Sequence, residues 1–521
     1  MTAFYLRTKS WLPIIPKTHA GVFILLFFLF SFSFSQSISF NQSFLDFNGK
    51  GSVSQGTFIQ FGPDGRLYVM ELKGLIKVFD VQKVGPNNYK VTAAETINAV
   101  KDIPNHNDDG SANTGNNREA TALYVGGTSS NPVLYVSSSD WRIGGPSGDK
   151  DLDTNSGVIT RLTWNGSSWV VVDIIRGLPR SEENHATHGL EFAIVGGKPY
   201  LLVCQGGHTN AGSPSNNFAW STEYALSGAI LAVDLNQING ISTKTDGSSG
   251  RKYIYDVPTL DDPTRNNVNG ITDPNASGYN GIDVNDPWGG NDGLNQGKLV
   301  QNGPIEIFSP GYRNSYDITL TQSGAVYVTD NGANGGWGGF PENEGLGGNV
   351  TNNYRPGEPG SSSSDNGEAP VNNNDHLTLI TNNIQSYSFG SFYGGHPNPV
   401  RANPSGAGLF TRGPHSSDPG DSNGNGYTDD WFRTSILGVN NSNFSTRSLP
   451  VDWPPVPVGM ANPVEGDFRN PGGSNPDGPD DNIVTTLQNN SNGIDEYTAS
   501  NFGGAMQGDL IIGRSSNLHR I

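Results

Sequence analysis

Cysteine is almost absent from this chain of 521 residues, in which Cys204 is the only one. A single cysteine excludes an intramolecular disulfide, so the fold has to be stabilised by packing, to which a bound metal ion can add. Cys204 follows an apolar run at residues 200–203, and we therefore expect a core residue, not a nucleophile. Long stretches with helical periodicity are also missing after the N-terminus, which excludes a helical bundle.

Positive charge is scarce as well. The chain has 31 Lys and Arg against 49 Asp and Glu, which gives a formal net charge of -18. Nucleic acids and anionic membrane surfaces both require basic patches, so we expect neither to be a partner. A surplus of carboxylates suits a soluble extracellular protein, and it suits calcium.

Glycine (69 residues) and proline (33 residues) are abundant and separate short apolar runs. One phrase recurs: an apolar strand, a tight turn and a second apolar strand, at residues 58–69, 122–136, 190–203, 317–328 and, in worn form, 506–512. Turn residues flanked by β-branched and aromatic residues indicate hairpins, and further strands follow several copies. Repeated units of this kind predict an all-β fold of the β-propeller type. A β-sandwich would also contain many short strands, but not the recurring phrase.

The N-terminus has the pattern of a secretory signal peptide. Arg7, Lys9 and Lys17 accompany an uncharged apolar stretch at residues 21–35. That stretch is short for a membrane span and fits the apolar region of a signal peptide. We expect residues 1–36 to be cleaved, leaving no membrane span and a secreted, periplasmic or cell-surface protein. An uncleaved N-terminal anchor is the alternative.

The expected propeller, residues 37–521, carries long polar loop insertions at about residues 266–295, 335–374 and 405–482. The last contains residues 421–432, in which oxygen-bearing side chains at loop positions 1, 3, 5 and 9 and a glycine at position 6 match an EF-hand-type calcium loop. The glutamate usual at position 12 is missing. We expect this loop to order the insertion by binding calcium through Asp421, Asn423, Asn425, Tyr427 and Asp429.

Three short motifs beside expected strands carry chemistry that catalysis or ligand binding can use. His185 and His188 precede a strand, and a neutral imidazole there is a candidate general base, although a pair of solvated loop histidines is the simpler interpretation. Arg313 and Asn314 offer a donor fork and an amide, which suit a carboxylate-bearing ligand or, more commonly, a turn at the surface. Residues 329–335 form a glycine-rich loop whose carbonyls suit calcium, or an ordinary turn.

Taken in order, the motifs resemble those of the soluble quinoprotein glucose dehydrogenases and the wider glucose/sorbosone dehydrogenase family. Residues 185–192 resemble the H-x-x-G-x-L-x-F segment whose histidine is the family's catalytic base. Residues 311–314 (GYRN) resemble the family's G-H-R-N. Residues 375–380 and 393–397 resemble its D-E-I-N-L-I and N-Y-G-W-P run, and residues 513–521 resemble a late strand pair.

The resemblance implies a six-bladed β-propeller that binds pyrroloquinoline quinone (PQQ) and calcium. It implies that His185 takes the proton from the anomeric hydroxyl of an aldose while hydride passes to the quinone, which gives a lactone. A sugar or glycan is then the substrate, and the electron acceptor stays open. The other residues that the resemblance assigns are Arg313, Asn314 and Arg514 for the cofactor and Gly332 and Ala333, through their carbonyls, for calcium.

The chain also departs from the family. It ends at Ile521 within the fifth phrase, so we expect a six-bladed type truncated in or after the fifth blade. Tyr312 replaces the histidine of G-H-R-N, and Arg514 replaces a lysine. A non-catalytic, calcium-stabilised propeller that binds a glycan or a protein is therefore one alternative. A calcium-dependent lactonase is another, and it would need carboxylates clustered around a central metal, for which Glu183, Glu191 and Asp330 are the candidates.

Overall fold

Short strands, joined by tight turns to their neighbours in sequence, build the protein. The computed structural model describes residues 38, 43–107, 110–144, 150–211, 216–218, 223–260, 266–273, 275–284, 296–335, 337, 374–396, 482–487, 490–514 and 517–521. The chain divides into two units, residues 1–44 and residues 45–521, and the fold given below is that of the second. The predicted signal peptide and the predicted EF-hand-type loop lie outside the described residues, and both remain predictions.

The first two sheets come from the N-terminal part of the second unit. One sheet has the order β1-β5-β4-β3-β2, in which β1 pairs parallel with β5 and the other pairs are antiparallel. Its strands are β1 (Leu45–Asp46), β2 (Gly56–Phe61), β3 (Leu67–Glu71), β4 (Ile76–Gly85) and β5 (Asn88–Ile97). The next sheet has the order β15-β16-β11-β10-β9-β8, with strands β8 (Arg118–Gly127), β9 (Pro132–Asp140), β10 (Gly157–Trp164), β11 (Trp169–Leu178), β15 (Lys244–Thr245) and β16 (Lys252–Asp256).

Three further antiparallel sheets follow in chain order. The third is β12 (Thr187–Val195), β13 (Lys198–Gln205), β14 (Ala229–Asp234) and β17 (Ile305–Pro310). The fourth is β18 (Ser315–Leu320), β19 (Val326–Asp330), β20 (His376–Thr381) and β21 (Ile483–Thr486). The fifth is β22 (Ser491–Glu496), β23 (Leu510–Arg514) and β24 (Asn517–Arg520).

Little else in the described residues is regular. A two-stranded ribbon pairs β6 (Asn105–His106) with β7 (Ala112–Asn113), and the one α-helix described is the short α2 (Leu235–Gly240). Three single turns of 3-10 helix complete the described elements, at Asn216–Phe218, Ile384–Ser386 and Asn501–Gly504. None of the helices in the described residues is long and apolar enough to cross a membrane.

The predicted hairpins are present at the predicted places. The phrase at residues 190–203 becomes β12 and β13, whose turn contains Gly196 and Gly197. Gly197 has φ +81°, a conformation that residues with a Cβ rarely adopt, so glycine is required there. The all-β prediction is therefore confirmed, and its signal was local: turn chemistry between two apolar runs.

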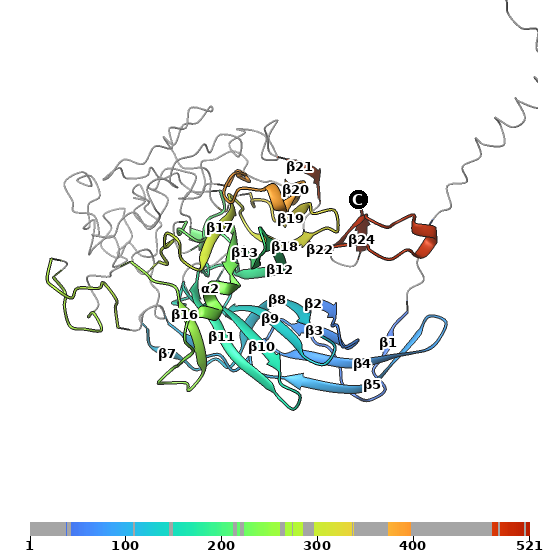
Figure 1. Cartoon of the computed structure of the whole chain (residues 1–521), viewed down its shortest axis with the longest axis horizontal. Coiled ribbons are helices and arrows are strands. Elements are labelled where there is room, and N and C mark those ends of the chain that lie inside the picture. Colours follow the sequence, from blue (N-terminus) through green and yellow to red (C-terminus); the bar gives the residue numbers. More distant parts are fainter. Residues whose placement is uncertain are drawn as a thin grey trace, which may run out of the picture. The chain divides into compact units, whose positions relative to one another are not determined.

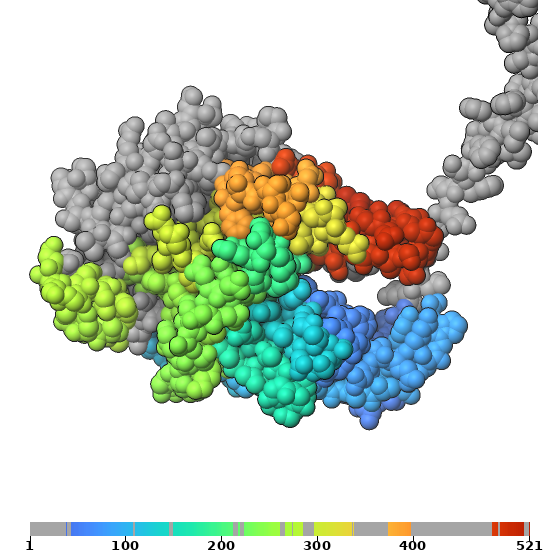
Figure 2. All heavy atoms as spheres, in the orientation of Figure 1, coloured from blue at the N-terminus to red at the C-terminus, as the bar shows by residue number. Residues whose placement is uncertain are grey.

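The sheets follow one another as the blades of a propeller do. Neighbouring sheets touch through β2 in the first sheet and through the first strand of each later sheet: β2 contacts β8, β8 contacts β12, β12 contacts β18, and β18 contacts β22. Figure 1 shows this succession, and in Figure 2 the blue residues of the first sheet lie directly against the cyan residues of the second. The first strands thus form an inner row with the later strands of each sheet outside it, which is a β-propeller-like arrangement. The number of six blades remains a prediction.

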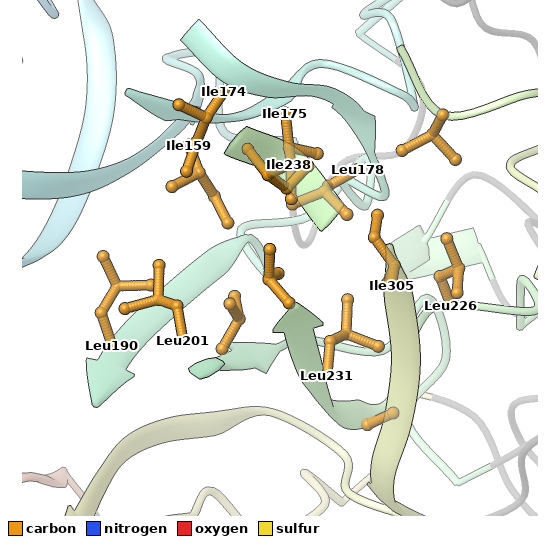
Figure 3. Close-up of a cluster of buried hydrophobic side chains, with 14 of the residues drawn as sticks. Ile159, Ile174, Ile175, Leu178, Leu190, Leu201, Leu226, Leu231, Ile238 and Ile305 are labelled. Carbon is orange, nitrogen blue, oxygen red and sulfur yellow. The ribbon is translucent and has the colours of Figure 1, made fainter. Parts of the chain in front are cut away.

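Apolar layers between neighbouring sheets hold this arrangement together. The cluster between the second and third sheets contains Ile159 and Ile175 on one side and Leu201, Leu231 and Ile305 on the other (Figure 3). Equivalent clusters lie between the first and second sheets, the third and fourth, and the fourth and fifth. Cys204 is fully buried in the third of these four clusters, as expected of a core residue. Alternate residues of each strand face these layers, so both faces of a middle sheet are apolar.

Candidate functional site

A cavity of about 440 Å³ lies where the inner strands begin. Thr121 of β8, His188 of β12 and Tyr316 of β18 line it, and so do Asn490 and Asn492 at the start of β22. Its other walls come from the loops that lead into or out of the strands. Because these loops converge from four sheets, residues far apart in the sequence meet at this point.

His185 is held in this cavity by the loop before β12. Its side chain is buried, and its Nδ1 lies 2.8 Å from the carbonyl oxygen of Gly207. A carbonyl oxygen only accepts hydrogen bonds, so Nδ1 carries the hydrogen and Nε2 holds the lone pair. Burial, and after it the charge of Arg313, keeps the pKa of His185 well below its ordinary value. The imidazole is therefore neutral at physiological pH, as a general base must be.

Glu183 stands on the same loop, beside the free nitrogen of that imidazole. Its Oε2 lies 3.5 Å from His185 Nε2 and accepts the backbone N–H of Asn184 at 2.7 Å. Both side chains line the cavity, and both are almost entirely buried. Burial raises the pKa of Glu183, and the charge of Arg313 opposes that effect.

Arg313 is the cation of the cavity wall. The residue is 4% exposed, and its Nε donates a hydrogen bond to Asn210 Oδ1 at 3.1 Å. Within the described part of the chain, its two Nη nitrogens meet no acceptor, and the residue lines the cavity. Burial lowers the pKa of Arg313. Several carboxylates act in the opposite direction and raise it, and among them Glu183 has the largest effect. A buried guanidinium with unused donors is an anion-binding group.

Asp330 fixes the two residues that carry these donors. Its carboxylate accepts the backbone N–H of Arg313 at 3.1 Å and that of Asn314 at 2.8 Å. Burial raises the pKa of Asp330 to about 6, against the hydrogen bonds from these two backbone groups. The sequence 313–314 is thus anchored through its backbone, so its side chains are free to face the cavity.

A row of polar side chains crosses the cavity from the second sheet to the fourth. Thr121 Oγ1 lies 3.0 Å from His188 Nδ1, and His188 Nε2 lies 3.0 Å from Asn314 Oδ1. Asn314 Nδ2 donates to Asn331 Oδ1 at 3.2 Å, and Asn331 Nδ2 donates to Asp375 Oδ2 at 3.3 Å. Burial lowers the pKa of His188 to about 3, so this histidine is neutral and acts as a hydrogen-bonding spacer.

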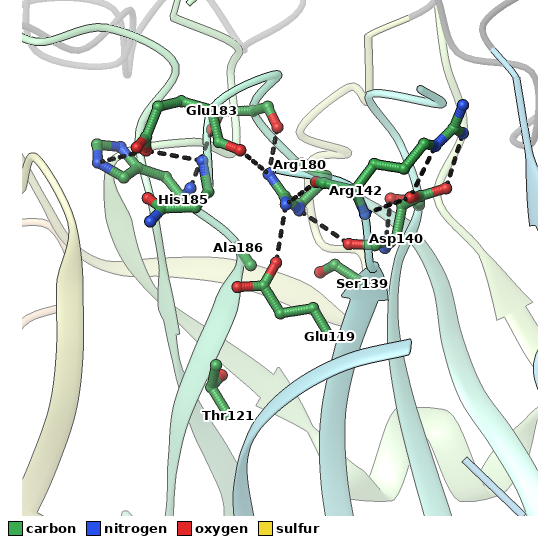
Figure 4. A network of polar contacts seen from close by, with 12 residues as sticks. Glu119, Thr121, Ser139, Asp140, Arg142, Arg180, Glu183, His185 and Ala186 are labelled. Carbon is green, nitrogen blue, oxygen red and sulfur yellow. Dashed lines mark hydrogen bonds and ion pairs between the residues drawn. The ribbon is translucent and has the colours of Figure 1, made fainter. Parts of the chain in front are cut away.

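Arg180 shapes the loop on which His185 and Glu183 stand (Figure 4). Its guanidinium forms an ion pair with Glu119 Oε2 at 2.8 Å and donates to the carbonyl oxygens of Arg142, Ser181 and Glu183. Burial raises the pKa of Glu119 to about 7 in spite of this ion pair. A fully buried arginine that binds four carbonyl oxygens, that of Asp140 included at 3.3 Å, determines the path of residues 180–185.

The loop after β13 positions His185 through the Gly207 carbonyl oxygen that its Nδ1 contacts. Glu223 is buried and accepts the backbone N–H groups of His208 and Thr209, both at 3.0 Å, and it lies 2.7 Å from His396 Nε2. Burial alone would raise the pKa of Glu223, but the charge of His396 and its hydrogen bonds lower it to about 2. This anion fixes the loop that presents the Gly207 carbonyl to His185.

Gly206, in that same loop, allows the close approach of His185 and Asn314. A Cβ at this position would lie 2.7 Å from Asn314 Oδ1 and 2.7 Å from His185 Cβ. Contacts below 3.0 Å require one of the groups to move, so any larger residue would displace His185 or Asn314.

The structure brings four of the predicted residues to the cavity: His185, Arg313, Asn314 and Gly332. Ala333 follows Gly332 and is buried, whereas Arg514 lies opposite Ser491 at the end of β23 and is not among the lining residues. Asp421, Asn423, Asn425, Tyr427 and Asp429 lie outside the described residues. The cavity also contains His188, the second histidine of the predicted motif, and Glu119, for which no role was predicted; the signal of Glu119 was position alone, near the start of a strand.

The described residues contain no group of three or more His, Cys, Asp and Glu side chains that could hold a metal ion. The lactonase alternative required such a cluster. Glu183 lines the cavity, but Glu191 and Asp330 are not among its lining residues. A metal in this cavity would therefore need carbonyl or amide oxygens beside any carboxylate.

Comparison with known proteins gives a likeness in fold. No protein-family profile matches the chain, and no curated protein sequence matches it. A solved oxidoreductase (glucose dehydrogenase) from Thermus thermophilus is 15% identical, with 66% of each chain covered and a TM-score of 0.27. The PQQ-bound aldose sugar dehydrogenase of Streptomyces coelicolor is 11% identical over 73% of this chain and 67% of its own, with a TM-score of 0.29. A Trichoderma reesei protein of carbohydrate-active enzymes family AA12 is 12% identical over 90% and 94%, with a TM-score of 0.33.

At these identities the likeness concerns the fold alone. The present chain spans 66% of the length of the Thermus protein.

Proposed function

We propose that the protein is an exported sugar dehydrogenase that oxidises the anomeric carbon of an aldose and uses PQQ and calcium. One observation carries the proposal: His185, Arg313, Asn314 and Gly332, selected from separate sequence motifs, line a single cavity. A general base, an anion-binding guanidinium and oxygen ligands in one buried cavity are the parts that such chemistry needs. The absence of a metal-binding acid cluster from the described residues makes the lactonase alternative weaker.

The cavity wall fits a cofactor that carries carboxylates. Arg313 is buried and has donors that no described acceptor uses, and Asn314 lies next to it with its backbone anchored on Asp330. A planar donor fork beside a fixed amide suits carboxylate and quinone oxygens. Arg313 and Asn314 would hold PQQ, which supplies a hydride acceptor when bound.

The part of the wall next to Asn314 fits calcium. Asn331, Gly332, Asn334, Asp375 and Asn492 line it, so carboxylate and amide oxygens prevail there. Calcium prefers oxygen ligands of this mixed kind, carbonyls included. The carbonyls of Gly332 and Ala333 would bind the ion, with Asp375 fixed nearby by the N–H of Gly332 at 3.1 Å.

His185 is the proton acceptor in this proposal. Nδ1–H is engaged by Gly207, so the lone pair of Nε2 is the one available to a hydroxyl. The neighbouring Glu183 and the buried surroundings keep bulk water from competing for it. On oxidation the substrate would give one proton to Nε2, and PQQ, when bound, would supply the acceptor of the hydride.

The test is a titration of the cofactor-free protein with PQQ, with and without calcium, read from the absorption spectrum of the quinone. We expect calcium-dependent binding, and bleaching on addition of at least one aldose from a panel. Arg313→Gln should abolish binding, because the anion-binding donors are lost. His185→Ala should keep binding and lose at least about a hundredfold in turnover, the usual contribution of a general base.

His106→Ala is the matched control, since His106 is outside the cavity lining. It should leave binding and turnover as in the unchanged protein. Absence of PQQ binding in the unchanged protein would refute the proposal. Binding without bleaching by any aldose would favour the non-catalytic alternative.

A further inference from the structure

Glu183 and His185 form a pair in the cavity wall. The proposed mechanism gives His185 the role of proton acceptor but gives Glu183 no part in the proton transfer. His185 Nε2, the nitrogen with the lone pair, lies 3.5 Å from Glu183 Oε2 in the cavity wall. The other nitrogen of the ring is occupied by Gly207. A carboxylate therefore stands beside the one position at which this imidazole can gain a proton (Figure 4).

The charges around His185 make that carboxylate necessary. The groups that act on the imidazole include Arg313, His188 and His396, and each of them disfavours a positive charge on it. The site is buried, so solvent cannot compensate. A proton taken up by Nε2 would create an imidazolium close to a guanidinium, and Glu183 is the acid in contact with it.

We propose that Glu183 is the charge-compensating partner of His185: it stabilises the imidazolium that forms when Nε2 takes the proton of a substrate hydroxyl. This inference rests on the proposed function for its substrate and its oxidant. The O–H bond of the hydroxyl breaks and an Nε2–H bond forms. Hydride would leave the carbon that bears this hydroxyl, with a bound quinone as its acceptor, so the substrate would lose one proton and one hydride, which together are two protons and two electrons.

Hydrogen bonds to both its side chain and its backbone hold Glu183 in position. Its Oε2 accepts the N–H of Asn184, and its own carbonyl oxygen is bound by Arg180. Arg180 is fully buried and paired with Glu119. The loop from 180 to 185 therefore holds the acid and the base on one side of the cavity. Glu183 acts through His185 and is a positioning residue in this scheme.

The kinetic test is Glu183→Gln in the full chain loaded with PQQ and calcium. We expect kcat with a bleaching aldose to fall about tenfold to a hundredfold, the value of a hydrogen bond to a charged group, with KM within about twofold. Glu183→Asp keeps the charge and should recover most of the loss. Glu182→Gln is the matched control, because Glu182 is a buried acid of the same loop outside the cavity lining. Unchanged kcat in Glu183→Gln would overturn the inference.

A second measurement needs no activity. His185→Lys places a permanent cation where the imidazolium would form, and the melting temperature of the cofactor-free chain reports its cost. We expect the melting temperature of the double variant Glu183→Gln, His185→Lys to fall by more than the sum of the decreases in the two single variants, because the cation then lacks its partner. The combination of His185→Lys with Glu182→Gln should be additive.

The two proposals fail in different ways. Additive effects of Glu183→Gln and His185→Lys would refute the pairing even in a protein that oxidises sugars. Absence of PQQ binding in the unchanged protein would refute the proposed function, and a non-additive stability cycle would then still establish the charge pair.

Discussion

His188 is the residue through which the cavity wall holds Asn314. Its ring lies between Thr121 and Asn314, 3.0 Å from each, and stacks on Tyr316 with ring centroids 5.1 Å apart. Burial lowers its pKa to about 3, so it is neutral, and its two ring nitrogens are both engaged, one by Thr121 and the other by Asn314, so that it offers no unengaged lone pair of the kind His185 has. In the proposed mechanism the two histidines of one motif thus have separate roles: His185 accepts a proton, and His188 fixes an amide.

We expect His188→Ala to weaken PQQ binding about tenfold, because Asn314 Oδ1 loses a buried partner. The measurement is the PQQ titration in the presence of calcium. His188→Gln reaches the same partners through an amide and should restore most of the affinity. An affinity that is unchanged in His188→Ala would show that Asn314 does not depend on this contact.

Strands and turns were predictable from the sequence where their determinants are local. The hairpin of β12 and β13 follows from Gly196 and Gly197 between apolar runs, and the structure has it as expected. The pairing of β14 with β17 was not predictable, because residues 235–304 separate them and nothing in either strand specifies the partner. Element type is a property of a short window, whereas sheet order depends on tertiary packing.

The candidate site divides in the same way. His185, Arg313 and Asn314 stand in motifs with recognisable spacing, so the sequence analysis selected them. Glu119 was not assigned a role, because its importance arises from a contact with a residue far away in the sequence, the ion pair with Arg180. Arg514 was selected by resemblance alone and lies outside the cavity lining, since its place is set by the pairing of β22 with β23.

The middle strands of the sheets are the elements most sensitive to loss of apolar volume. Leu231 on β14 is fully buried between the second and third sheets. We expect Leu231→Ala to lower the free energy of unfolding by about 2–5 kcal/mol, through lost transfer energy and the cavity left behind. Val170→Ala, at a half-exposed position of β11, should change it by no more than about 0.5 kcal/mol. Denaturant unfolding measures both, and equal effects would contradict the packing of the sheets described above.

At the scale of the whole molecule, the row of inner strands is joined by polar contacts as well as by apolar layers. Asp317 of β18 accepts the N–H of Ile494 of β22 at 3.0 Å, so it ties the fourth sheet to the fifth. Gly189 of β12 approaches the same carboxylate so closely that a Cβ there would lie 2.7 Å from its Oδ1. Burial raises the pKa of Asp317 to about 7, and burial with the charge of Asp317 raises that of Glu191 well above its ordinary value. Three sheets therefore meet around acids that prefer to be protonated.

This junction predicts that stability depends on pH. An acid whose pKa is raised in the folded state binds its proton more tightly there than in the unfolded chain, so its contribution is complete below the unfolded value and is lost as the pH rises. For Asp317 the window runs from the ordinary value of 3.8 to about 7. Each pH unit within it should lower the free energy of unfolding by at most about 1.4 kcal/mol for this group.

Denaturant unfolding at a series of pH values between about 4.5 and 7.5 measures the slope across that window, and Asp317→Asn should reduce it. The variant should also be less stable at the acid end of the series, because an amide offers one acceptor where the carboxyl group serves two backbone N–H groups, those of Ile318 and Ile494. Asp80→Asn, at an exposed position of β4, should leave the slope in place. A stability that rises with pH through this window would mean that Asp317 is not buried among the three sheets. A slope that survives in Asp317→Asn would assign the effect to Glu191 or to the acids of the cavity, Glu119 first among them.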